Sequence, residues 1–245
     1  MAASEVKRGG GGSAVLPIVL GCVGGGCLIV VIAIVVVGIM VGSFVKDVKG
    51  LVADTPAVSP YEPTPVQTAA LDEKLAAVSA KLQTGQGATL ELTPAELNTL
   101  IANEQAKANA PNPIRVLVEI KGDTVFGKAS IPFPGQGGPA KYLNGEADLN
   151  VRIVDGQLEV YVRDFRVTDR QMPTLFKTMI ASVKQQNLAQ DFNTNPQHAA
   201  AQQKLRQVES LEVRDGKIHL KLKPQPTPVA PPAAPQPSTA GNEPI

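Results

Sequence analysis

The sequence predicts an α+β domain, in which an antiparallel, meander-like sheet is covered by helices, behind an N-terminal transmembrane helix. Three patterns lead to this prediction. Residues 14–45 carry no charged side chain, apolar residues recur at helical spacing in 71–82, and polar and apolar residues alternate along 115–121 and 145–153. A period of two is typical of strands with one buried face, and a period near 3.6 is typical of an amphipathic helix.

The apolar segment is long enough to cross a bilayer. Its core, residues 24–45, meets the requirement of about 20 apolar residues for a hydrocarbon layer about 30 Å thick. A cleaved export signal has a shorter apolar region that ends in a small-residue cleavage site. We therefore expect a permanent single-pass anchor in a cell membrane. Lys7 and Arg8 precede the segment, which favours a cytoplasmic N-terminus and an extracytoplasmic domain.

Two further features of this segment suggest hypotheses. Cys22, in the context V-L-G-C, resembles a lipid-attachment site, but the apolar lead before it is short and is interrupted by Pro17. A full apolar span would also remain after cleavage at Cys22, so lipid attachment is the less favoured alternative. Gly38 and Gly42 have the spacing that lets two membrane helices pack closely, which suggests a homodimer through this helix. Glycine is common in membrane helices in any case, so this spacing also has a simpler explanation.

Composition divides the chain into five parts. The flanks of the domain are rich in proline, and such segments bury too little apolar surface to form a core. The predicted parts are a short basic, Gly-rich tail (1–13), the transmembrane helix (14–45), a Pro-rich spacer (46–69), the α+β domain (70–223) and a Pro-rich disordered tail (224–245).

Four helices are expected in the domain. The first contains the stripe Leu71, Leu75, Val78 and Leu82, which has the spacing of one helix face. The second begins at the segment T-P-A-E, residues 93–96, which combines a capping box with proline at the first helical position. Two later helices, at 173–186 and 196–208, carry apolar residues on one side and can cover the apolar face of the sheet.

The strands follow from alternation. They are expected at 89–92, 115–121, 125–131, 145–153, 158–162, 211–213 and 218–222. Asp155-Gly156 and Asp215-Gly216 are typical of two-residue hairpin turns. Asp164 would face inward if the alternation after Leu158 continued, so we predict a bulge near Arg163 that turns Phe165 and Val167 inward.

The domain lacks the patterns that bring reactive groups together. Both cysteines lie in the apolar segment, and the two histidines, His198 and His219, have no recognisable metal-ligand or catalytic partner at a fixed spacing. We therefore predict no enzymatic activity, no cofactor and no metal. Lys and Arg number 23 against 22 for Asp and Glu, a net charge of +1, which predicts no nucleic-acid partner.

Three short motifs resemble those of a known family. The run LTPAELNTLIA (92–102), the run YLNGEA (142–147) and the run VDGQLEV (154–160) are similar to the YpmS-type family of bacterial membrane-anchored domains. That family also places an apolar anchor before an L-T-x-x-E-L-N helix start and a strand meander. The resemblance implies an extracytoplasmic, lipid-handling domain, and it transfers no catalytic residues.

These observations predict a membrane-anchored accessory or binding protein. Its expected partners are the lipid bilayer and a bound lipid or acyl chain. The expected apolar groove is the aliphatic sheet face formed by Val118, Ile131, Leu149 and Val160, although the same residues would also suit an ordinary core. The alternative is a structural or interaction protein that uses its Pro-rich tail to reach a partner or the cell wall.

Overall fold

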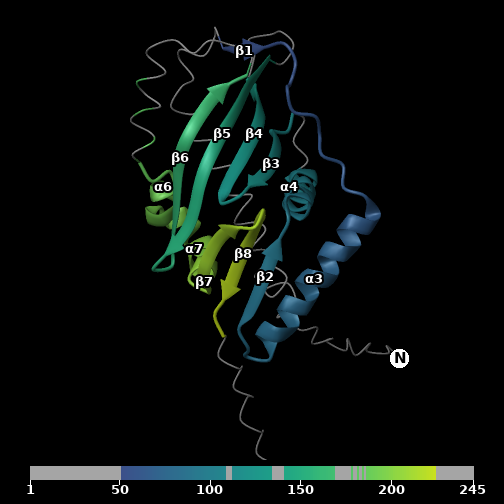
Figure 1. The fold of residues 1–245 in the computed structure, drawn as a ribbon, viewed down its shortest axis with the longest axis vertical. Helices are drawn as coiled ribbons and strands as arrows, with labels where there is room; N and C mark the ends of the chain where they lie inside the picture. Colours follow the sequence, from purple (N-terminus) through teal and green to yellow (C-terminus); the bar gives the residue numbers. More distant parts are fainter. Residues whose placement is uncertain are drawn as a thin grey trace, which may run out of the picture.

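The computed structural model describes residues 51–108, 112–133, 141–168, 178, 181, 184 and 186–224. These residues form an α+β domain with few helices and two antiparallel sheets, which confirms the predicted α+β class but gives two sheets where one was expected (Figure 1). The predicted transmembrane helix, including Cys22, Gly38 and Gly42, lies outside the described residues. In the part of the chain that is described, no helix is both long and apolar enough to cross a membrane.

The larger sheet is a meander with one added strand. It runs in the order β3, β4, β5, β6, and the short β1 pairs with β5 beyond the end of β6. The strands are β1 (Val52–Ala53), β3 (Arg115–Lys121), β4 (Thr124–Phe133), β5 (Lys141–Val154) and β6 (Gln157–Val167). All pairings are antiparallel, as the alternating pattern predicts.

The smaller sheet has the order β2, β8, β7. Its strands are β2 (Ala88–Leu92), β7 (Val208–Arg214) and β8 (Lys217–Leu222). The turn between β7 and β8 lies against the turn between β3 and β4, because the Gly216 amide donates to the Gly122 carbonyl at 3.4 Å. The two sheets therefore meet at their hairpin ends.

The predicted turns and bulge are confirmed. Asp155 and Asp215 have φ of 52° and 53°, and the glycine after each also has a positive φ, as a two-residue hairpin turn requires. In the β5–β6 ladder, Leu149 pairs with Val162 but Asp148 pairs with Asp164, so Arg163 is the extra residue of a bulge. Val167 is consequently buried, and Phe165 packs against the core.

Two long helices lie along the β2 and β3 side, and short helices lie along the β6 side (Figure 1). The former are α3 (Pro65–Gln83) and α4 (Pro94–Ala108), and the latter are α6 (Gln190–Thr194), the 3-10 turn η2 (Pro196–His198) and α7 (Ala199–Leu205). Most of the predicted helix 173–186 lies outside the described residues. The short α6 has no counterpart among the predicted helices.

The start of α4 shows why the T-P-A-E-L-N segment folds as it does. The Thr93 amide and hydroxyl donate to Glu96 Oε2 at 2.8 and 2.9 Å, and Lys74 forms an ion pair with Glu96. Burial by itself raises the pKa of Glu96, but the bonds from Lys74 and Thr93 outweigh it and lower the pKa below its ordinary value. The buried Asn98 then reaches β3, where it bonds both the amide and the carbonyl of Val118 at 2.8 Å.

Contacts with the sheet and helix α3 begin before residue 70, where the sequence analysis places the start of the domain. Residues 51–64, which we call the strap, are not a free spacer, because Leu51 and Val58 are buried and β1 is paired with β5. Helix α3 begins at Pro65, where the Thr64 hydroxyl and the Gln67 side chain form a capping box. Proline content suggested a spacer, but the strap is held by contacts from the sheet that its own composition does not reveal.

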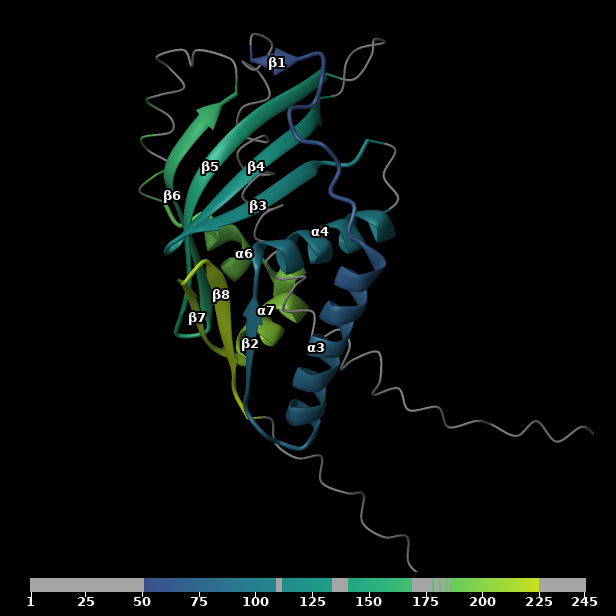
Figure 2. The same cartoon turned by 45° about the vertical axis from the view of Figure 1, so that its right-hand side comes forward.

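The described domain has two opposite ends. β1 lies at one end of the long axis, and β8 finishes at the other, where the described chain ends at Pro224 (Figures 1 and 2). The chain therefore enters the domain at one end and leaves it at the opposite end.

Candidate functional site

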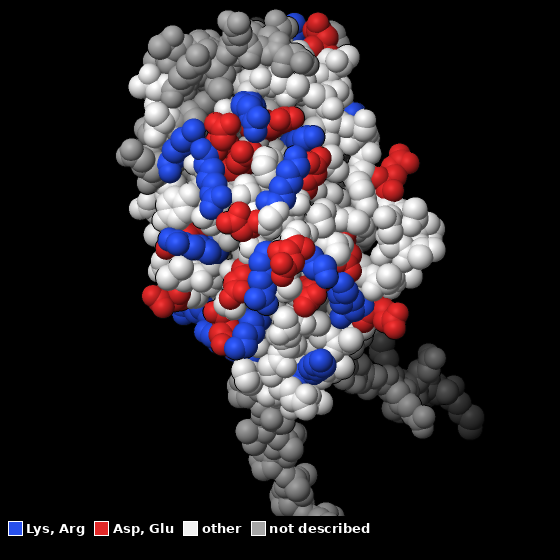
Figure 3. All heavy atoms as spheres, in the orientation of Figure 1, with Lys and Arg blue, Asp and Glu red and all other residues white. Residues whose placement is uncertain are grey.

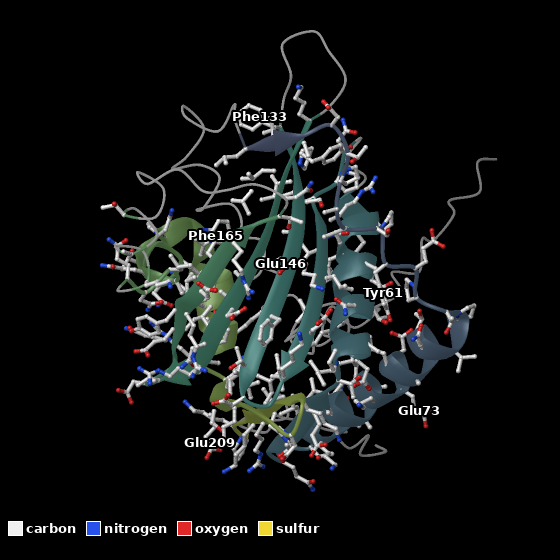
Figure 4. All side chains as sticks on the ribbon, turned by 45° about the horizontal axis from the view of Figure 1, so that its top comes forward. Tyr61, Glu73, Phe133, Glu146, Phe165 and Glu209 are labelled. Atoms are coloured by element: carbon white, nitrogen blue, oxygen red, sulfur yellow. The ribbon has the colours of Figure 1, made fainter. Side chains whose placement is uncertain are left out.

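A second, smaller apolar cluster lies at the β1 end of the larger sheet. Its buried members are Leu51, Leu143 and Val167, each at most 7% exposed. Partly buried residues pack around them, namely Val52, Ile131, Phe133 and Phe165, and Figure 4 shows Phe133 beside β1. We call these seven residues the edge cluster.

The edge cluster is continuous with the main core. Ile131 and Phe165 pack against both groups of buried residues. The Phe165 ring lies over Gly145, since a Cβ added to this glycine would come within 3.2 Å of two ring carbons. Gly145 therefore leaves room for the aromatic ring that joins the two apolar groups.

The middle of the same sheet face carries only small residues. Gly127 pairs with Ala147 and Ala129 pairs with Gly145, so these four residues form one patch across β4 and β5, which we call the small-residue floor. A Cβ added at Gly127 would meet no atom within 4 Å in the part of the chain that is described. As far as the described residues show, the floor has space above Gly127, and Phe165 is the β6 partner of Ala147 at its border.

The opposite face of the sheet binds the strap through one row of polar side chains. Arg115, Ser130 and Asn144 lie directly opposite one another on β3, β4 and β5, and we call them the polar row. The Asn144 amide group donates to the Thr55 carbonyl and accepts from the Ala57 amide, both at 3.0 Å.

The next residue of the strap completes this contact. The Val58 amide donates to the Ser130 hydroxyl at 2.9 Å, and Arg115 Nη1 donates to the Val58 carbonyl at 3.4 Å. Ser130 and Asn144 are buried, so the strap backbone satisfies polar groups that would otherwise lack partners. Figure 2 shows the chain running from β1 past the ends of the strands to α3.

Beyond the polar row, this outer face is charged. Lysines and arginines are interspersed with acidic side chains, as the face turned to the viewer in Figure 3 shows. Lys128 and Lys121 pair with Glu119 at 3.2 and 3.4 Å, and the bond from Lys128 is the main reason that the pKa of Glu119 is lowered. Glu146 lies near the middle of this face (Figure 4). Because both signs alternate, this face carries no patch of a single charge.

The two histidines have different neighbours. His219 Nδ1 lies 3.5 Å from Glu91 Oε1, and only 13% of its side chain is exposed, so it is less solvated than its position between two lysines suggests. His198 stacks on Phe192 with 5.2 Å between ring centroids. Among the described residues, no three His, Cys, Asp or Glu side chains are grouped so that they could hold a metal ion.

The four residues of the predicted groove share one sheet face but differ in setting. Val118, Leu149 and Val160 are buried in the main core, with at most 6% exposure, whereas Ile131 is partly buried and packs against both the main core and the edge cluster. Their role in ligand binding stays a prediction.

The sequence pattern missed the strap, the polar row and the edge cluster. The turn after Lys121 already places Arg115 opposite Ser130, but nothing in the sequence indicates that both meet Val58, 57 and 72 positions upstream. Comparison with known proteins adds no family: no family model matches the sequence, and no curated protein matches it.

Proposed function

We propose that this chain is a single-pass, membrane-anchored accessory protein that binds a lipid acyl chain at the edge cluster of an extracytoplasmic domain. The observation that carries the proposal is the short connection between the predicted anchor and this cluster. Only residues 46–50 separate the end of the apolar segment from Leu51, which is 4% exposed within the cluster. Even a fully extended connection of that length spans only about 20 Å.

The chemistry of this sheet face supports the same function. The edge cluster is aliphatic and aromatic, and it leads to the small-residue floor through Ile131 and Phe165. An acyl chain needs apolar contact along its length and few polar groups, and lipid pockets are commonly lined in this way. The space above Gly127 is where such a chain would find room.

A photoactivatable phospholipid with a diazirine on its acyl chain tests the proposal in the full-length protein reconstituted into nanodiscs. We expect crosslinks in two places, the anchor and the peptides that carry the edge cluster and the floor. The anchor crosslinks serve as an internal standard, because every anchored molecule contacts lipid. Crosslinks confined to the anchor would contradict lipid binding by the domain.

A matched pair of substitutions makes this test specific. Gly127→Leu fills the space on the floor and is expected to reduce crosslinking of the domain by about tenfold, the equivalent of roughly 1.4 kcal/mol of binding free energy. Asn150→Leu places the same side chain on the partly exposed outer face of β5 and is expected to leave crosslinking unchanged. Equal effects of the two substitutions would remove the floor from the proposed site.

One observation favours a second candidate, a protein that reaches a distant partner with its Pro-rich tail. The described chain begins at Leu51, beside β1, and ends at Pro224, at the opposite end of the domain (Figure 1). As an extended polyproline-like chain, residues 225–245 would span about 65 Å. Deletion of this tail should remove pull-down partners, and an unchanged set of partners would rule this candidate out.

A further inference from the structure

The strap wraps around one edge of the larger sheet. Val52 pairs with Leu143, and both belong to the edge cluster on one face. Asn144, the next residue of β5, points to the opposite face, where it bonds Thr55 and Ala57. Within a few residues, the chain passes from the apolar face to the polar face, and it is held on both.

The apolar end of the strap covers the edge cluster. Leu51 is one of its three buried members, and Val52 packs beside it. Without these two side chains, Leu143 and Val167 would lose the neighbours that the strap supplies. Among the described residues, the strap is thus the element that covers this end of the cluster, and residues 46–50 join it to the predicted anchor.

The polar end of the strap is held by contacts that are specific but few. Four hydrogen bonds join residues 55–58 to Asn144, Ser130 and Arg115, and the exposed pair of Lys141 and Asp54 lies 3.3 Å apart. Segments held by few buried contacts open locally more readily than the strands beneath them. The strap can therefore leave the sheet while β3, β4 and β5 stay paired.

We propose that opening of the strap controls access of a lipid acyl chain to the edge cluster. Leu51 and Val52 block the cluster, and the polar row holds the strap on the sheet. We call this arrangement the latch. This inference rests on the proposed function and adds its regulation. When the strap is seated, Leu51 and Val52 fill the entry that lies next to the membrane. When it is released, the same apolar surface is open to an acyl chain from the adjacent bilayer leaflet.

A reversible lock tests the latch in the full-length protein. Ala53 and Tyr142 are direct partners in the β1–β5 ladder, so Ala53→Cys with Tyr142→Cys places two thiols at a separation suited to a disulfide. The natural Cys22 and Cys27 are replaced by serine. Oxidation is expected to lower acyl crosslinking at the edge cluster by about tenfold, with anchor crosslinks unchanged, and reduction is expected to restore it.

The matched control joins two strands of the sheet to each other without tying the strap to either of them. Lys128 and Glu146 are direct partners in the β4–β5 ladder, so Lys128→Cys with Glu146→Cys introduces a comparable disulfide on the outer face. This lock should leave crosslinking at the edge cluster unchanged. Equal crosslinking of the strap-locked protein in its oxidised and reduced forms would overturn the latch but not lipid binding. Absence of domain crosslinks in both forms would overturn the proposed function and, with it, the role of the latch.

Hydrogen exchange of the same full-length protein measures strap opening without any lipid. Asn144→Ala removes two of the four bonds and is expected to speed exchange of the Ala57 and Val58 amides by about tenfold, while amides within the β4–β5 ladder keep their rates. Strap amides that exchange only as fast as the β4–β5 ladder would show that the strap never opens alone, and this result would overturn the latch.

Discussion

At the two edges of the larger sheet, asparagine side chains form hydrogen bonds that a neighbouring strand would otherwise form. Asn98 on α4 bonds the amide and the carbonyl of Val118 on the free edge of β3. On the other rim, Asn193 bonds the amide and the carbonyl of Leu158, at 3.2 and 2.7 Å, and Asn187 accepts from the Val160 amide. A carboxamide offers one donor and one acceptor side by side, as a peptide group does. These asparagines therefore satisfy backbone groups at both edges of the sheet in place of further strands.

Replacement of Asn98 by alanine should destabilise the domain by about 2–4 kcal/mol, because the buried amide and carbonyl of Val118 both lose their partner. Urea unfolding followed by circular dichroism measures this loss. Asn150→Ala is the control, since Asn150 is partly exposed on the outer face, and it should change the free energy of unfolding by no more than about 0.5 kcal/mol. Similar losses for both variants would show that Asn98 does not stabilise the β3 edge.

The lowered pKa of Glu96 makes the stability of the domain depend on pH. Since its pKa is lower in the folded state, the unfolded chain binds more protons in this range, and stability rises with pH. The contribution is complete above the ordinary value of 4.5 and disappears as the pH falls through the folded pKa.

Glu96→Gln should therefore cost about 1 kcal/mol at pH 7, with Lys74 partly exposed, and the difference from wild type should shrink as the pH falls below about 4. Urea unfolding at a series of pH values provides the measurement. Glu73→Gln is a suitable control, because this exposed side chain lies on the outer side of α3 (Figure 4). A difference that stays constant down to pH 3 would contradict the assignment.

At the scale of elements, the bulge in β6 decides which side chains of this strand reach the core. Arg163 is the extra residue, and its side chain stays outside, where it donates to Thr124 at 3.0 Å. Val162 before it is 2% exposed, and Phe165 after it packs against both apolar groups. One inserted residue thus keeps apolar residues on the inner face on both sides of the bulge.

Two single-residue deletions separate the effect of losing the bulge from the effect of shortening the strand. Deletion of Arg163 leaves Val162 inside and Asp164 outside, so we expect a loss of only about 1 kcal/mol from surface contacts. Deletion of Tyr161 instead turns Val162 outward and Arg163 inward, which should cost more than about 4 kcal/mol or prevent folding. Thermal and urea unfolding measure the stability of the two variants. Equal losses of stability would mean that the bulge does not determine which side chains of β6 face the core.

How far the elements follow from the sequence depends on the range of the interactions involved. The turn at residues 122–123 fixes the β3–β4 register, and Asp155-Gly156 fixes the start of the β5–β6 ladder, so both were predictable from local pattern. The β4–β5 register was not, because Phe133 and Lys141 are joined by seven residues without a two-residue turn. The strap depends on Asn144 and Ser130, more than 70 positions away, so composition alone described it as a spacer.

At the scale of the whole molecule, the strap joins the entering chain to the domain. It contributes to both faces of the larger sheet and leads into α3, whose N-terminus is capped by Thr64. β1 is the first described strand, and it lies at the end of the domain opposite the end of β8 (Figure 2). The domain boundary that matters for folding is thus the start of the strap.

Two fragments that differ only in the strap test this boundary. A fragment of residues 51–223 keeps all described contacts of the strap, whereas residues 60–223 retain the Thr64 cap and lose Leu51, Val58 and the bonds to the polar row. Burial of two large aliphatic side chains stabilises by about 1.5–3 kcal/mol each, and each hydrogen bond adds about 1 kcal/mol. Fixing the backbone of the strap residues costs about 1–2 kcal/mol each and offsets most of this gain, so the shorter fragment should be less stable by about 1–3 kcal/mol and should still fold. Urea unfolding should find both fragments cooperative with a lower midpoint for the shorter one, and equal midpoints would show that the strap adds nothing to the fold.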